Sequence, residues 1–133
     1  MFEVSRRFRF SAAHRLFKYE GPCAHLHGHN YTVTVTVRAA DLTDDMVLDF
    51  RQLKCIGTWI QRTLDHNTLL GEDDPLVANI RCHVFRSRPT AENIAKLLWK
   101  VSTEQLGPKY HVSSVSVEET DGCIATYIPT SAA

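Results

Sequence analysis

The sequence lacks any hydrophobic run close to the ~20 residues needed to span a bilayer, although 44% of its 133 residues are apolar. It also lacks net charge, because 15 basic residues balance 15 acidic ones, and this argues against a strongly charged partner. The first residues, Met-Phe-Glu-Val-Ser-Arg-Arg, contain no apolar stretch typical of a secretory signal. We expect a soluble, cytoplasmic protein of one domain, residues 1–133, that binds neither nucleic acid nor membrane.

Cysteine is present without a pattern, because Cys23, Cys55, Cys82 and Cys123 form no Cys-x-x-Cys pair and no dense disulfide framework. We therefore expect reduced thiols. Cys55 falls in a predicted helix and Cys123 beside an apolar strand, where packing is the ordinary role of a thiol. Cys23 differs because it precedes a pair of histidines by four residues, where a bound dication favours the thiolate. Cys23 is the candidate nucleophile or acid/base.

Hydrophobic periodicity predicts the order strand, strand, helix, helix, strand, strand, with no internal repeat and no linker. Apolar stripes of helical spacing run through residues 50–64 and 91–101, and Thr90 is placed as the N-cap of the second helix. Two alternating segments, 112–119 and 124–128, are predicted as strands joined by a tight turn. The pattern predicts an α+β domain.

Three histidines lie on the first two predicted strands, and alternation places them on one face. His14 continues the even parity of the apolar positions in 8–12. His27 and His29 share the odd parity of the apolar positions in 31–37. Both strands therefore direct imidazoles to the same side.

Three imidazoles on one face indicate a metal site. Neutral imidazoles suit Zn²⁺, and three protein ligands leave the fourth tetrahedral position open for water or substrate, which is the pattern of catalytic zinc. Three unrelated polar residues at strand ends are the alternative, and the shared face favours zinc. His25 lies one residue off that face, so we assign it to solvent or to the surroundings of the ligands.

Parity also separates two neighbouring glutamates near the end of the predicted strand 112–119. Val115 and Val117 face the core, so Glu119 points inward while Glu118 points to solvent. A carboxylate on an apolar face must be paired or used. A side chain that bends back to water at a strand end is the alternative.

The dipeptide Asp65-His66 closes the first predicted helix and is a second acid/base candidate. An adjacent carboxylate can raise the pKa of an imidazole and hold it as a proton donor. Neighbouring residues on a helix do not face each other, so the two couple directly only if the helix has ended there. Arg81, Arg86 and Arg88 follow in a loop where contact with phosphate is possible, although solvated arginines are more common.

Six blocks of sequence together resemble one enzyme family. They are Phe10-Ser11-Ala12-Ala13-His14, Cys23-x-x-x-His27-Gly28-His29-Asn30-Tyr31, Met46-Val47-Leu48-Asp49-Phe50, Leu64-Asp65-His66, Pro89-Thr90-Ala91-Glu92-Asn93-Ile94-Ala95 and Val117-Glu118-Glu119-Thr120. In their order and over almost the whole sequence, they resemble the 6-pyruvoyltetrahydropterin synthase family. The three residues between Cys23 and His27 are similar to the bacterial 6-carboxytetrahydropterin synthases of queuosine biosynthesis, whereas animal 6-pyruvoyl enzymes usually have a longer gap.

The resemblance implies a tunnelling fold, in which each subunit gives a four-stranded antiparallel sheet with two helices on one face. Three subunits would close a barrel, and two barrels would stack into a homohexamer. Closure by oligomerisation removes the two open edges of such a sheet.

The resemblance also implies a zinc-dependent lyase that converts 7,8-dihydroneopterin triphosphate to 6-carboxy-5,6,7,8-tetrahydropterin, with release of triphosphate and acetaldehyde. A 6-pyruvoyl product is the alternative within the family. Zn²⁺ on the three histidines would polarise the side-chain hydroxyls of the substrate. The implied roles of the other residues are proton transfer by Cys23, a proton relay by Asp65 and His66, and pterin binding by Glu119 with Thr90 and Glu92.

Two interpretations from other classes stay open. A zinc hydrolase would ionise water at the open position and would need neither Cys23 nor Glu119. A non-catalytic pterin-binding or structural assembly would use zinc to tie two strands together, with Cys23 as the fourth ligand. The sequence departs from the family at Leu70, where Asn or Asp is frequent, and in the long basic segment 73–88, which we interpret as a loop without an assigned triphosphate contact.

Overall fold

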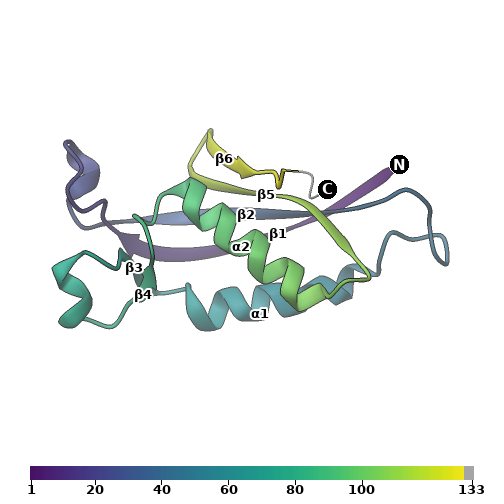
Figure 1. The fold of residues 1–133 in the computed structure, drawn as a ribbon, viewed down its shortest axis with the longest axis horizontal. Coiled ribbons are helices and arrows are strands. Elements are labelled where there is room, and N and C mark those ends of the chain that lie inside the picture. The colour runs from purple at the N-terminus through teal and green to yellow at the C-terminus, as the bar shows by residue number, and fades with distance from the viewer. Residues whose placement is uncertain (131–133) are drawn as a thin grey trace.

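One six-stranded sheet runs through the molecule, with helices on one of its faces (Figure 1). The computed structural model describes residues 1–130, so the end of the predicted domain, residues 131–133, lies outside the described residues. The strands are β1 (Phe2–His14), β2 (His27–Ala39), β3 (Asn67–Gly71), β4 (His83–Phe85), β5 (His111–Thr120) and β6 (Cys123–Tyr127). The helices are α1 (Lys54–Thr63) and α2 (Ala91–Leu106), with short 3₁₀ turns at Pro22–Ala24, Phe50–Leu53 and Pro75–Ala78.

The prediction of a four-stranded antiparallel sheet is wrong in its strand number. The order is β4-β3-β1-β2-β5-β6, in which the four predicted strands β1, β2, β5 and β6 are antiparallel neighbours. β3 pairs in parallel with β1, and β4 pairs in parallel with β3, so the sheet is mixed. The two added strands span five and three residues, which is too short for alternation to mark them. The α+β class and the two helices agree with the prediction.

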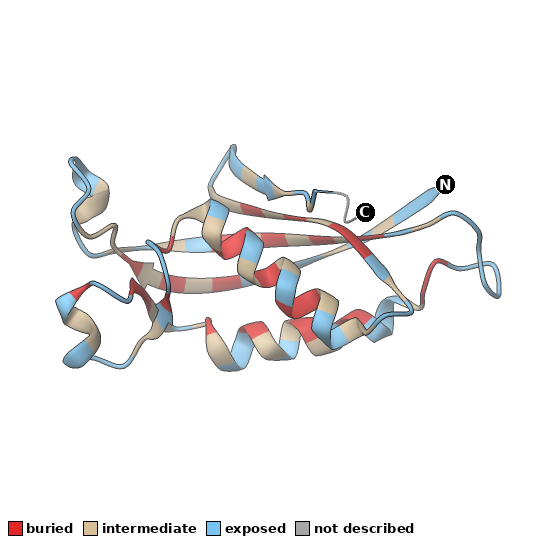
Figure 2. Cartoon of the chain, in the orientation of Figure 1, coloured by how far each residue is buried: buried red, intermediate tan, exposed pale blue. Residues whose placement is uncertain are grey.

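Two long strands form the middle of the sheet. β1 and β2 each span 13 residues and pair from Phe2↔Ala39 at one end to His14↔His27 at the other. Buried and more exposed positions alternate along both strands (Figure 2). A rise of about 3.3 Å per residue puts the two ends roughly 40 Å apart. The histidines therefore lie together at one end of the molecule.

Both helices bury one stripe against the sheet. α2 packs on β5 and β6, and α1 contacts β1. Thr90 caps α2 as predicted, because its hydroxyl accepts a 3.2 Å hydrogen bond from the backbone N–H of Asn93. Phe50 was expected on the apolar stripe of the first helix and is instead 53% exposed. It lies in a 3₁₀ turn before α1, whose tighter winding takes it off the stripe. The buried helix residues are Ile56, Ile60, Ile94, Ala95, Leu98, Val101 and Ser102.

The structure bears on two expectations from the composition, one about membrane-spanning segments and one about the cysteines. Within residues 1–130, no helix is long and apolar enough to cross a bilayer. The four cysteines are free thiols, which agrees with the absence of a disulfide pattern in the sequence.

An ion pair ties the segment after β3 to the end of β1. The buried Asp74 carboxylate accepts two hydrogen bonds from the Arg15 guanidinium, and the one from Nε is 2.6 Å long. It also accepts a 2.9 Å hydrogen bond from the backbone N–H of Leu76 and so caps the 3₁₀ turn 75–78. The guanidinium holds the pKa of Asp74 below its usual value. The contact fixes the residue that follows His14.

Asp74→Asn is expected to lower the free energy of unfolding by about 1–2 kcal/mol at neutral pH, because it removes the negative charge that pairs with the partly exposed Arg15. A depressed carboxyl pKa stabilises the fold above the unfolded value of about 4, and the stabilisation is lost as the pH falls below it. Variant and wild type should therefore converge in acid. Urea unfolding across pH measures this, with Asp73→Asn as an exposed control. A difference that does not shrink in acid contradicts the prediction.

Candidate metal centre

The three predicted histidines meet at one end of the sheet. In the β1–β2 ladder His14 lies opposite His27, and Ala12 lies opposite His29. The Nε2 atoms of His14 and His27 are 3.1 Å apart, and the potential ligand atoms of all three side chains lie within 4.8 Å of one another. Zinc–nitrogen bonds of about 2.0–2.1 Å in a tetrahedron would separate the nitrogens by about 3.3 Å. The spacing of the cluster is close to that of a metal site.

Backbone carbonyls select the nitrogen that two of these rings present. His14 Nδ1 lies 2.8 Å from the carbonyl oxygen of Pro89, and His27 Nδ1 lies 2.6 Å from that of His25. A ring that donates its Nδ1 proton to a carbonyl offers the lone pair of Nε2 to the cluster, and such contacts orient metal-binding histidines. His25 takes part through its backbone while its side chain is exposed. The two carbonyls therefore act as the outer support of the cluster.

The cluster favours neutral imidazoles. Burial lowers the pKa of both His14 and His29, and the positive charge that a neighbouring imidazole would carry lowers it further. His29 Nε2 is buried and has no hydrogen-bond partner among residues 1–130. A buried lone pair without a donor fits a metal ion, and three nitrogens match a site with one open position. Among the described residues, Cys23 is not part of this group.

The two glutamates point in the directions that parity predicts. Glu119 Oε1 lies 3.5 Å from His14 Nε2 and 3.9 Å from His29 Nε2. Glu118 instead accepts a 3.0 Å hydrogen bond from the backbone N–H of Gly122 in the turn between β5 and β6. The Glu119 side chain is 27% exposed. Its carboxylate therefore borders both the histidine cluster and solvent.

Tyr31 belongs to the site, although the sequence pattern marked it only as an apolar strand position. Its ring is fully buried, stacks on Phe10 with centroids 4.7 Å apart, and meets His14 and His29 edge-on. Its hydroxyl has no hydrogen-bond partner among the described residues. Burial, and to a smaller extent the charge of Glu119, raises the pKa of Tyr31, so the hydroxyl keeps its proton. The available signal was a tyrosine two positions after a histidine on the same strand face.

The loop that carries Cys23 begins and ends at the cluster. It joins β1 to β2, whose facing ends are His14 and His27. The backbone N–H of Leu16 donates a 2.8 Å hydrogen bond to the carbonyl of Cys23, which closes the loop on itself. Cys23 is half-buried in the 3₁₀ turn 22–24. The loop thus connects the two histidine-bearing strand ends, and Cys23 is not among the clustered ligand atoms of the described residues.

Asp65 and His66 contact each other just after α1. The helix ends at Thr63, and His66 adopts a φ of 58°, which turns the backbone out of the helical path. Asp65 Oδ2 then lies 2.9 Å from His66 Nδ1, so the condition for direct coupling is met. Asp65 Oδ1 accepts a 2.9 Å hydrogen bond from the backbone N–H of Ser11, which is the main reason that the pKa of Asp65 is lowered.

The Asp65-His66 pair lies beside a cavity that one histidine of the cluster also lines. The His66 side chain is 83% exposed. It borders a cavity of about 440 Å³ that is also lined by His29 of the cluster and by Ser11 and Asn30. Those two residues alternate with Ala12 and His29 along their strands and therefore lie on the opposite, polar face of the sheet. Within the described residues, the histidine cluster does not include His66.

Nearly the whole chain matches one known family. The family model of 6-pyruvoyl tetrahydropterin synthase covers residues 3–130. The chain belongs to this family. The 6-carboxy-5,6,7,8-tetrahydropterin synthase of Rickettsia typhi is 33% identical over 92% of this chain and 97% of its own length. The 6-pyruvoyl tetrahydrobiopterin synthase of Homo sapiens is 34% identical over 94% of this chain and 90% of its own length.

A solved structure extends the family match to the fold. The structure of Caenorhabditis elegans 6-pyruvoyl tetrahydropterin synthase matches with a TM-score of 0.77 and 29% identity, over 97% of this chain and 96% of that chain. The mixed sheet and the two helices are therefore those of the 6-pyruvoyl tetrahydropterin synthase family.

The remaining predicted binding residues of this family member lie around the start of α2. Thr90 follows Pro89, whose carbonyl contacts His14, but its hydroxyl is occupied in capping the helix. Glu92 is exposed on the first turn of α2. The guanidinium carbon of Arg88 lies 5.8 Å from the centroid of the Tyr19 ring. The three loop arginines Arg81, Arg86 and Arg88 are exposed.

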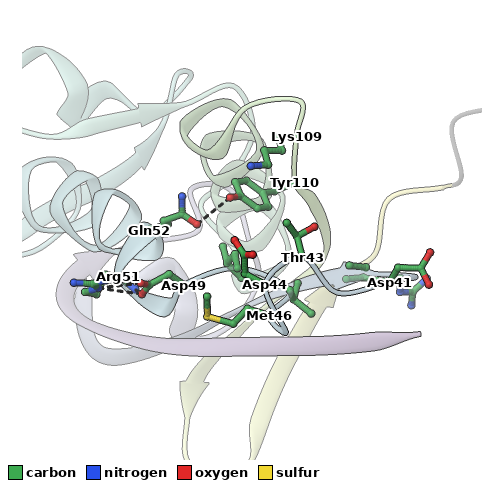
Figure 3. Close-up of a pocket in the computed structure, with 13 residues that line it drawn as sticks. Asp41, Thr43, Asp44, Met46, Asp49, Arg51, Gln52, Lys109 and Tyr110 are labelled. Carbon is green, nitrogen blue, oxygen red and sulfur yellow. Dashed lines mark hydrogen bonds and ion pairs between the residues drawn. The ribbon is translucent and has the colours of Figure 1, made fainter.

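A second cavity of this 6-pyruvoyl tetrahydropterin synthase family member lies at the other end of the sheet, near Arg38 at the end of β2 (Figure 3). It has a volume of about 670 Å³. Its polar groups are partly paired, because Asp49 binds Arg51 at 2.6 Å and the Tyr110 hydroxyl lies 3.0 Å from Gln52 Oε1. The lining contains neither histidine nor cysteine. This cavity is separate from the histidine cluster.

Proposed function

We propose that this protein is a zinc-dependent lyase that converts 7,8-dihydroneopterin triphosphate to 6-carboxy-5,6,7,8-tetrahydropterin, with release of triphosphate and acetaldehyde, in queuosine biosynthesis. The observation that carries the proposal is the convergence of three imidazoles beside the carboxylate of Glu119. The name of the Rickettsia typhi relative supports it. The open metal position and the nearby carboxylate suit a substrate that combines hydroxyls with a pterin ring.

Zinc bound by His14, His27 and His29 would polarise the substrate's side-chain hydroxyls and acidify the adjacent C–H bonds. Cys23 is the group that would take up and return the proton there, because its loop joins the two strands that hold the histidines. The buried ring of Tyr31 closes the inner side of the site against water. Proton transfer would thus take place on the solvent side of the cluster.

Glu119 would hold the pterin ring. A carboxylate accepts two parallel hydrogen bonds, and the pterin amino group and its neighbouring ring N–H form a matching pair of donors. Because Glu119 lies 3.5 Å from His14 Nε2, the same contact would fix the distance between the ring and the metal-bound part of the substrate. Thr90 and Glu92 at the start of α2 would assist.

We infer that Asp65 and His66 act as a proton relay on the site of a neighbouring subunit. The His66 side chain is 83% exposed, and His66 is not a member of the histidine cluster among the described residues. The edge strands β4 and β6 leave unpaired backbone groups, and Ile124 beside one edge is 61% exposed. A homohexamer of two stacked trimers would cover such edges and bring the pair to the histidine cluster of another subunit.

A 6-pyruvoyl product is the alternative, and the relatives do not decide between the two. The bacterial 6-carboxy enzyme and the human 6-pyruvoyl enzyme are 33% and 34% identical to this protein. The three-residue spacing between Cys23 and His27 favours the 6-carboxy product by resemblance. The choice depends on whether the enzyme cleaves one carbon–carbon bond in the substituent on the pterin ring.

Incubation of the zinc-loaded protein with 7,8-dihydroneopterin triphosphate tests the proposal. Mass spectrometry of the pterin, together with an assay for acetaldehyde, should find 6-carboxytetrahydropterin and acetaldehyde in equal amounts. A 6-pyruvoyl product without acetaldehyde would assign the alternative. Absence of turnover by a zinc-replete preparation would overturn the lyase, and full activity of Cys23→Ala would favour a zinc hydrolase. 7,8-Dihydroneopterin without the triphosphate is the matched control substrate, since it lacks the leaving group.

Glu119→Gln is expected to weaken pterin binding about 100-fold, because it removes a charged acceptor of two hydrogen bonds. Glu118→Gln is the matched control and should bind like the wild type, because its amide oxygen can still accept from Gly122. Fluorescence titration with 7,8-dihydroneopterin gives both affinities. Equal affinities would mean that parity selected the wrong glutamate, and loss of zinc from Glu119→Gln would make Glu119 a metal ligand instead.

A further inference from the structure

The hydroxyl of Tyr31 is a buried donor that the proposed chemistry does not use. The residue has no exposed surface, and its hydroxyl has no hydrogen-bond partner within residues 1–130. A buried hydroxyl without a partner costs roughly 1–3 kcal/mol. Phenylalanine would fill the same space between Phe10 and the histidines without that cost. A hydroxyl in such a place needs a partner.

Strand register identifies the partner. The β2–β5 ladder ends at the pair Thr32↔Glu118, and Tyr31 and Glu119 are the residues that directly follow this pair on the two strands. Side chains opposite each other on one face have Cβ atoms about 4.5–5.5 Å apart. Glu119 Oε1 lies 3.5 Å from His14 Nε2 and 3.9 Å from His29 Nε2. Both of these rings meet the Tyr31 ring edge-on, so the Glu119 carboxylate is a nearby side-chain acceptor.

We propose that Tyr31 is a positioning residue, whose hydroxyl donates a hydrogen bond to Glu119 when the pterin is bound and holds the carboxylate toward the ring. This inference rests on the proposed function, because it assigns Glu119 to the pterin. A carboxylate has about four acceptor sites, so it can bind two pterin donors and one phenol together. Binding of the pterin fixes the Glu119 side chain in one rotamer, which costs conformational entropy. The hydrogen bond from Tyr31 would offset part of this cost.

Tyr31→Phe tests the inference with little change in shape. The dissociation constant for 7,8-dihydroneopterin, measured by fluorescence, is expected to rise about tenfold, in line with one hydrogen bond to a charged group. KM should rise with it while kcat stays within about twofold. The melting temperature should stay equal or rise, and the zinc content should not change. Tyr110→Phe is the matched control, because its hydroxyl contacts Gln52 at the opposite end of the sheet (Figure 3).

A double-mutant cycle identifies the route of the effect. If Tyr31 acts through Glu119, Tyr31→Phe should change pterin affinity by less than about twofold in a Glu119→Gln background. An unchanged dissociation constant in Tyr31→Phe overturns the inference, as does a tenfold loss that persists in the double variant. A lower melting temperature with an unchanged dissociation constant would make Tyr31 structural only. Failure of the wild type to bind any pterin would instead overturn the proposed function together with this inference.

Discussion

His27→Ala is expected to lose bound zinc and with it essentially all turnover of 7,8-dihydroneopterin triphosphate. The variant removes one of three imidazoles whose potential ligand atoms lie within 4.8 Å of one another. Loss of a mere outer partner of a metal ligand costs roughly 10–100-fold in metal affinity or activity, so loss of a ligand itself should cost more. Two nitrogens do not make a stable zinc site, because zinc sites in proteins use at least three protein ligands.

His25→Ala is the matched control for that experiment. The side chain of His25 is exposed, and only its backbone carbonyl contacts His27 Nδ1. Alanine keeps this carbonyl, so the control should retain stoichiometric zinc and activity. Metal analysis by mass spectrometry and the acetaldehyde assay measure both variants. Full zinc and full activity in His27→Ala would remove the metal assignment, and a persistent zinc–sulfur bond near about 2.3 Å in X-ray absorption would make Cys23 the fourth ligand.

Alternation along two long strands is why the position of the histidines could be predicted. Side chains two residues apart on a strand share a face. The apolar residues next to His14, His27 and His29 on their strands were therefore enough to predict the direction of these side chains. The same rule gave the directions of Glu118 and Glu119. The N-cap of α2 followed from Thr90 alone. These inferences depend only on local backbone geometry, which can be predicted from the order of neighbouring residues.

Contacts between distant segments could not be read in this way. The carbonyl of Pro89 reaches His14 across 75 residues, and a backbone oxygen leaves no mark in the residue type. β3 and β4 are short and pair in parallel, and β4 lies within the segment 73–88 that was interpreted as a loop. Tyr31 has an apolar ring and a polar hydroxyl, and the pattern registers only the ring. The features that the sequence pattern did not predict all depend on contacts with residues that are distant in the sequence.

Mixing two inactive variants is expected to restore activity if sites are shared between subunits. Cys23→Ala and His66→Ala should each be inactive alone, because one lacks the thiol and the other the relay. In a random mixed oligomer, about one site in four would combine an intact Cys23 from one subunit with an intact His66 from its neighbour. Recovered activity should therefore approach about a quarter of the wild-type value at equal mixing.

The structural basis of this expectation is the position of the relay within its own subunit. Asp65 is held by the backbone of Ser11, and its partner His66 is exposed beside residues of the polar face. Among the described residues, His66 is not a member of the cluster of His14, His27 and His29 in its own subunit, so we place it at the cluster of a neighbouring subunit. Native mass spectrometry must first show that subunits exchange. Exchanged but inactive mixtures would then confine the relay to a single subunit, whereas a quarter of the activity would require Asp65 and His66 to act across a subunit interface.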